Sequence, residues 1–145
     1  MTKVLPDKEP ERQSSDEEQV GRLVAALCER LDEVLPRNQF EVAVEHRYAV
    51  RIRGVGAYRG NTVWLSPTAV WCSPLPVQER LQIFLEAVGR HVQRFVSRRH
   101  KRWPTMSAKP RVSICEDRIL MWWGGVKEED AVVALRPILR REIGV

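Results

Sequence analysis

Hydrophobic residues repeat with a helical period in two long stretches of the chain. Between residues 20 and 35, leucine and valine return every three or four positions, and the stretch ends before Pro36. The same period returns between residues 81 and 96. We therefore predict a first helix at about residues 16–35 and a second at about residues 76–102.

Shorter stretches alternate with a period of two, which is typical of strands with one buried face. In "RYAVRIRG" (residues 47–54), apolar residues alternate with arginines, so a strand with a basic outer face is expected. "TVWLS" and "AVWCS" are predicted to be two further short strands, with Trp64 and Trp71 in the core. Whether "FEVAVE" at residues 40–45 is a strand of its own stays open.

The last third of the chain predicts a hairpin and a helix. "RVSIC" and "RILMWWG" flank Glu116-Asp117 as two antiparallel strands, and "KEEDAVVALRPILRREI" is expected to form a last helix interrupted near Pro137. The element order is then α-β-β-β-α-β-β-α. It predicts the α+β class, with a mostly antiparallel sheet of about five strands and helices packed on it.

The chain has the length of one domain. Its 145 residues are enough to bury a core without disulfides or metals. Residues 1–13 are polar and carry two prolines, so we expect a disordered N-terminal tail there and a single α+β domain over residues 14–145.

This element order resembles that of the small type III secretion chaperones and their bacterial relatives. The resemblance lies in topology, covers most of the chain and rests on no sequence motif. It implies a homodimer that holds extended peptide segments of a protein partner.

Charge is unevenly distributed along the sequence. The net charge is +5, and residues 7–33 are acid-rich, whereas residues 90–111 hold eight lysines and arginines and no carboxylate. Such segregation favours a polyanionic partner.

The basic residues of the second predicted helix fall on one face, opposite its apolar stripe. Because they could contact phosphates, we predict a nucleic-acid-binding surface, with Trp103 stacking on an exposed base. The basic face of the strand at residues 47–54 could extend it. The predicted binding residues are Arg90, Arg94, Arg98, Lys101, Arg102, Trp103, Arg47, Arg51 and Arg53. The alternative is a solvated helix face, with Trp103 packed under the following loop.

A different class of function is suggested by Trp122 and Trp123. Adjacent residues of a strand point to opposite faces, so one of these side chains could be exposed as an aromatic anchor at a protein interface. The alternative prediction is therefore a protein-binding adaptor or a secretion-chaperone-like homodimer without a nucleic-acid role. Helices covering both tryptophans would remove this argument.

Catalytic and metal-binding patterns are absent from the sequence. The three cysteines are isolated and the three histidines have no partner at metal-ligand spacing, so no metal, cofactor or enzymatic activity is expected. Isolated cysteines favour a reduced compartment, and no apolar stretch is long enough for a signal peptide or a membrane span. We expect a soluble, cytoplasmic binding protein.

Overall fold

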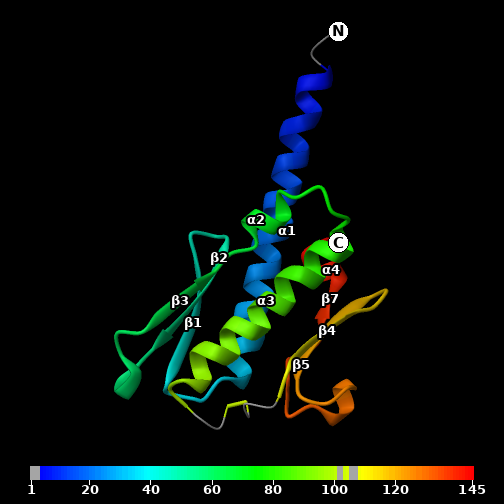
Figure 1. Ribbon diagram of the computed structural model, residues 1–145. Coiled ribbons are helices and arrows are strands. Elements are labelled where there is room, and N and C mark those ends of the chain that lie inside the picture. The colour runs from blue at the N-terminus through cyan, green and yellow to red at the C-terminus, as the bar shows by residue number, and fades with distance from the viewer. Residues whose placement is uncertain (1–3, 101–102, 105–107) are drawn as a thin grey trace.

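Helices and antiparallel strands form a single domain in the computed structural model, which describes residues 4–100, 103–104 and 108–145, with side chains from residue 17 onward (Figure 1). The predicted α+β class is confirmed. In chain order the elements are α1 (Val4–Val34), β1 (Phe40–Glu45), β2 (Ala49–Gly54), the 3-10 turn η1 (Gly56–Tyr58), β3 (Thr62–Leu65), α2 (Thr68–Trp71), α3 (Val77–Ser97), β4 (Pro110–Ile114), β5 (Arg118–Trp123), the 3-10 turn η2 (Glu128–Asp130), β6 (Val133–Ala134), β7 (Ile138–Leu139) and α4 (Arg140–Ile143).

The described strands form two sheets, where the sequence predicts one. Sheet A has the order β1-β2-β3, and sheet B has the order β4-β5-β6, with β7 also paired to β5. All described pairings are antiparallel. The open question about residues 40–45 is thereby answered, because β1 pairs with β2 along its whole length.

Helix α3 covers the outer edge of β4 and so keeps the two sheets apart. Gln82 donates from Nε2 to the backbone oxygen of Val112 (3.2 Å), and Gln93 donates from Nε2 to that of Ala108 (2.5 Å). These carbonyls point away from β5, so the glutamine amides take the place of a neighbouring strand. A further strand could not pair with β4 at this edge.

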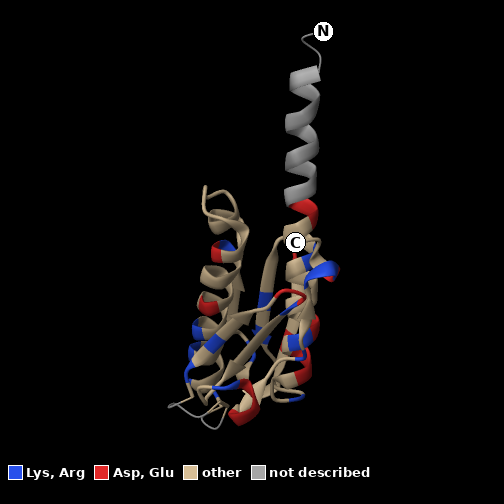
Figure 2. Ribbon diagram, turned by 90° about the vertical axis from the view of Figure 1, so that its right-hand side faces the viewer, with Lys and Arg blue, Asp and Glu red and all other residues tan. Residues whose placement is uncertain are grey.

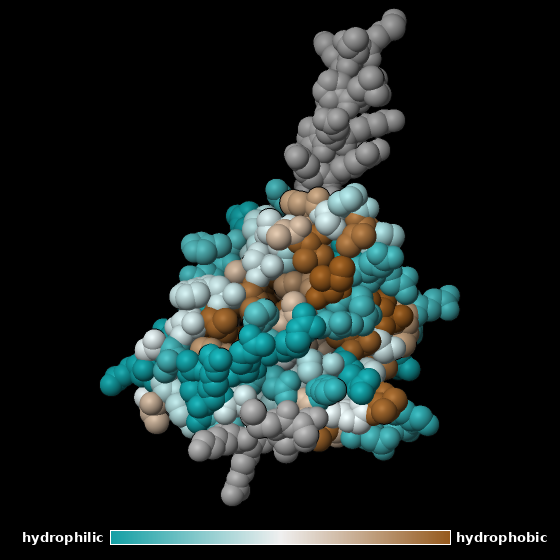
Figure 3. Space-filling model, viewed as in Figure 1, coloured by the Kyte–Doolittle hydropathy of each residue, from teal (hydrophilic) through white to brown (hydrophobic). Residues whose placement is uncertain are grey.

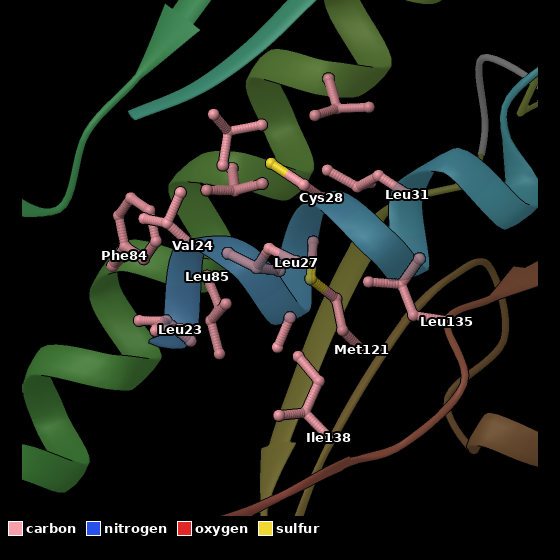
Figure 4. Packing of buried hydrophobic residues seen from close by; sticks show 14 of the residues in the cluster. Leu23, Val24, Leu27, Cys28, Leu31, Phe84, Leu85, Met121, Leu135 and Ile138 are labelled. Carbon is pink, nitrogen blue, oxygen red and sulfur yellow. The ribbon is translucent and has the colours of Figure 1, made fainter. Parts of the chain in front are cut away.

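One hydrophobic core joins both sheets to the two long helices. Phe40 of sheet A meets Phe95 of α3 with ring centroids 5.9 Å apart. On the other side, residues of α1 and α3 pack against sheet B and the last segment of the chain (Figure 4). The labelled core residues are Leu23, Val24, Leu27, Cys28, Leu31, Phe84, Leu85, Met121, Leu135 and Ile138.

The last segment is also held to α1 by charged contacts. The side chain of Arg30 is only 3% exposed, and its Nη2 donates to both carboxylate oxygens of Glu142 (2.8 and 3.0 Å) and to the backbone oxygen of Pro137 (3.2 Å). Arg136 pairs at the surface with Glu29 and Glu33 of the same helix. The segment from β6 to α4 is therefore fixed on α1 by both apolar and ionic contacts.

The two long helices occur where they are predicted, with different ends. α1 begins at Val4, earlier than residue 16. The disordered tail predicted over residues 1–13 stays a prediction, and residues 1–3 lie outside the described part of the chain. α3 ends at Ser97 instead of residue 102. None of the helices described is long and apolar enough to cross a membrane.

Two predicted elements are wrong. "AVWCS" lies mostly in the short helix α2 and the turn after it, because its five residues are too few to distinguish a strand from a helical turn. The last helix is replaced by η2, β6, β7 and the four-residue α4. Pro137 lacks the amide that a helix needs, and the backbone before it extends sheet B instead, with the Leu135 amide donating to the Met121 oxygen (3.0 Å).

Candidate nucleic-acid interface

The exposed face of α3 carries a row of arginines. Its opposite face is buried against the core from Leu81 to Val96. Arg90, Arg94 and Arg98 are exposed and lie four residues apart, which places them about 6 Å from one another along the helix axis. We call these three residues the arginine row.

No counter-charge lies against this row in the part of the chain that the structure describes. None of the three side chains forms an ion pair or a hydrogen bond with a described residue. Glu86, one turn before Arg90, contacts Gln82 instead, at 2.5 Å. Figure 2 shows basic residues on the later half of α3, after acidic residues on its first half. The row therefore presents its positive charge to solvent.

The end of α3 is fixed beside the loop between β2 and β3. The guanidinium of Arg99 lies over the Phe95 ring, 4.1 Å from its centroid, and donates from Nη2 to Asn61 Oδ1 at 2.9 Å. Exposed Arg59 lies two residues before Asn61 in the same loop. Lys101 and Arg102, which the sequence includes in the site, lie outside the described residues.

The predicted strand half of the interface is neutralised. Arg53 pairs with Glu41 at 2.7 Å, and Arg51 lies 3.6 Å from both Glu41 and Glu45. The register of β1 and β2 places these carboxylates beside the arginines on the outer face of sheet A. Arg51 and Arg53, which the sequence includes in the interface, therefore have carboxylate partners within the chain.

The arginine row and the outer face of sheet A also point in different directions. Val50 and Ile52 of β2 are buried toward the helices, so Arg51 and Arg53 between them point away from the helices. Arg47 is exposed and free of described ion pairs, but it lies in the turn between β1 and β2, near Gly21 of α1. These three arginines do not extend the row into one surface.

Trp103 is buried, so its indole is not exposed for the stacking on a base that the sequence predicts. Its Nε1 donates to the backbone oxygen of Val34 (2.8 Å), and its ring lies 5.3 Å from that of Trp123. The indole instead belongs to the hydrophobic core.

Trp122 and Trp123 are likewise buried, so neither offers the exposed indole on which the predicted protein interface depends. Trp123 donates to the Gly89 oxygen of α3 at 3.1 Å, and Trp122 donates to the Gly125 oxygen at 3.3 Å. The segment after β5 turns back and pairs β6 with β5 at Trp122 and Trp123.

The exposed aromatic residue that sequence reasoning missed is Trp64. It was expected in the core but is 57% exposed, and its Nε1 donates to Glu45 Oε2 at 2.7 Å. The alternation in "TVWLS" indicates this exposure, since Val63 and Leu65 on either side of Trp64 contact the core and Trp64 must then point the other way.

Comparison of the chain with models of protein families, with curated proteins and with solved structures finds no match.

Proposed function

We propose that this protein binds nucleic acid through the phosphate backbone, using Arg90, Arg94 and Arg98, and that it catalyses no reaction. The observation that supports the proposal is the absence of described counter-charges along the row, whereas Arg51, Arg53 and Arg136 each face a carboxylate. Like charges four residues apart on a helix repel by a few tenths of a kcal/mol. Phosphates would relieve that repulsion and would release their own counterions.

The length of the row suits several consecutive phosphates. It extends about 12 Å along the helix axis, and each strand of B-DNA carries one phosphate per about 3.4 Å. With Trp103 buried, no aromatic contact to a base supports sequence recognition by this surface. The binding proposed here is therefore sequence-tolerant and strongly salt-dependent.

Fluorescence anisotropy with labelled duplex and single-stranded oligonucleotides across a salt series tests the proposal. The key variant replaces Arg90, Arg94 and Arg98 with Gln. Its matched control replaces Arg51, Arg53 and Arg136 with Gln, which removes the same number of charges from paired positions.

We expect the row variant to lose about 2.7 units from the slope of log affinity against log salt on duplex DNA, at about 0.9 per phosphate contact. The control should keep most of the slope. Equal losses in the two variants would mean that net charge alone drives association. An absence of binding by the unmodified protein at low salt would contradict the proposal outright.

A second candidate function is protein binding, now favoured by Trp64 instead of Trp122 and Trp123. Exposed tryptophan is typical of interface anchors, and β3 has a described strand neighbour only on its β2 side. Sedimentation velocity would test a homodimer of this kind: Trp64→Ala should dissociate it, whereas Thr62→Ala on the same strand should not.

A further inference from the structure

A cleft of about 730 Å³ opens where α1, α2 and the start of α3 meet, at the other end of α3 from the arginine row (Figure 1). Its size lies within the range of small-molecule sites. The residues that matter for its chemistry are Val20, Tyr48, Trp71, Cys72, Leu75 and Arg80. In the space-filling view, hydrophobic residues gather on the surface toward the end of the domain where α1 enters it (Figure 3).

Arg80 is held in a fixed position in this cleft. Its guanidinium lies over the Trp71 ring, 5.3 Å from the centroid, and its Nη1 donates to the Trp71 backbone oxygen at 3.0 Å. Among the described residues no carboxylate pairs with it. A cation held by an aromatic ring and a carbonyl has already lost its side-chain freedom, so a ligand would meet a preorganised group.

One donor of Arg80 stays available to a ligand. Nε of Arg80 is enclosed by protein atoms, as is Nε1 of the almost completely buried Trp71, so neither faces the cleft. Nη1 is engaged by the Trp71 backbone oxygen, and Nη2 has no acceptor among the described residues. An unpaired guanidinium N–H that is held in place suits the oxygen of a carboxylate.

The other walls of the cleft restrict what the ligand is. Val20, Tyr48 and Leu75 offer apolar surface to a hydrophobic body. Glu17 also lines the cleft and carries a negative charge, which opposes a second negative charge on the ligand. A monoanion with an apolar body therefore fits better than inorganic phosphate or a dicarboxylate.

We propose that this cleft binds a small organic monocarboxylic acid, with its carboxylate on Nη2 of Arg80 and its apolar body against Val20, Tyr48 and Leu75. This site is separate from the arginine row, because Arg80 lies about 15 Å before Arg90 along the helix axis. The proposal does not depend on nucleic-acid binding.

The exposed thiol of Cys72 provides a direct measurement of occupancy. Burial raises the pKa of Cys28 to about 12, so that thiol stays protonated and unreactive, and Cys115→Ser removes the remaining competitor. The rate at which Cys72 reacts with a chromogenic disulfide reagent is then followed with 4-phenylbutyrate, acetate, octanoate, inorganic phosphate or the neutral 4-phenylbutyramide present. Reaction should slow in proportion to the unoccupied fraction, about tenfold when the acid is at ten times its dissociation constant.

We expect 4-phenylbutyrate or octanoate to protect Cys72, and the amide, acetate and phosphate to protect it much less. Arg80→Gln should abolish protection by the acids, while Arg90→Gln, on the same helix but outside the cleft, should leave it unchanged. If Arg80→Gln does not fold, as judged by circular dichroism, Leu75→Trp decides, since it fills the cleft from a partly exposed position and should also abolish protection. The proposal would be overturned if the acid and its amide protect Cys72 equally, or if neither apolar acid protects it at millimolar concentration. Full protection in a folded Arg80→Gln variant or in Leu75→Trp would overturn it as well.

Discussion

Two groups of arginines in this molecule have the same charge and opposite surroundings. Arg51 and Arg53 on the outer face of sheet A are each within ion-pair distance of Glu41. Arg90 and Arg94 on α3 are exposed without a described partner. In the sequence both groups look alike, as regularly spaced cations on the polar side of an amphipathic element.

The difference arises from how each element acquires neighbours. A helix presents to each residue the positions three and four away in the same sequence, whereas a strand presents residues of another strand. Glu41 is twelve residues from Arg53 and becomes its partner only through the pairing of β1 with β2. A basic stretch in a strand is therefore weaker evidence for a polyanion site than the same stretch in a helix.

Lowering the pH should have the largest effect on stability, because it protonates the carboxylate partners of all the paired arginines at once. The hydrogen bond from Arg136 holds the pKa of Glu33 below its usual value of 4.5. Partial burial raises the pKa of Glu142, but the Leu139 amide and Arg30 outweigh it and hold that pKa below 4.5 as well.

Both carboxylates therefore contribute stability that is fully present above about pH 4.5 and is lost as the pH falls through their lowered folded-state values. Urea unfolding at a series of pH values should show this loss. A Glu33→Gln, Glu142→Gln variant should show a flatter profile, and a profile as steep as that of the unmodified protein would contradict the assignment.

Glu142→Gln should have the next largest effect, since it leaves the buried guanidinium of Arg30 without its carboxylate. Breaking a fully buried pair costs about 3–5 kcal/mol; because a third of the Glu142 side chain is exposed, we expect about 2 kcal/mol less free energy of unfolding. Chemical denaturation measures it, with Glu129→Gln at an exposed position as the control. A difference from the control below about 0.5 kcal/mol would show that Arg30 is satisfied by backbone oxygens alone.

A double-mutant cycle at Glu41 and Arg53 should give a smaller coupling. Both side chains are about half exposed, so solvent screens the pair and the coupling free energy should be about 0.2–1 kcal/mol. The cycle uses Glu41→Gln, Arg53→Gln and the double variant, measured by urea unfolding. A coupling that does not decrease with added salt would argue against an ion pair.

Arg94→Gln should have the smallest effect on stability, and of the opposite sign. Removing the middle cation of the row relieves its repulsion with Arg90 and Arg98, so the free energy of unfolding should rise by a few tenths of a kcal/mol. Salt should shrink this gain. A loss of more than about 0.5 kcal/mol would reveal a stabilising partner for Arg94 and would weaken the case for a free surface.

The sequence predicts correctly which residues are buried or exposed where the pattern of a single element determines it. The helical period between residues 81 and 96 places the core face of α3, and it places Arg90, Arg94 and Arg98 on the opposite face, which the structure bears out. The prediction fails where a second segment decides. The burial of Trp122 depends on the segment after β5 folding back along it, and that of Trp103 on the end of α1.

The hairpin of β1 and β2 shows why the paired arginines could not be foreseen. His46 and Arg47 both have left-handed backbone angles in its turn, with φ of 51° and 70°. Such turns usually carry Asn-Gly or Asp-Gly, and neither occurs here. Without that signal the strand at residues 40–45 stayed undecided, and with it the position of Glu41 beside Arg53.

The ion pair between Arg30 and Glu142, which fixes the last segment of the chain on α1, also has a consequence for synthesis of the chain. Helix α1 leaves the ribosome before the rest of this domain, yet Leu135, Ile138 and Ile143 complete the core against which it packs. Until those residues emerge, the nascent protein carries an amphipathic helix with part of its apolar face uncovered. A ribosome stalled before residue 133 would therefore present a chain that cannot close its core and that exposes apolar surface to chaperones and proteases.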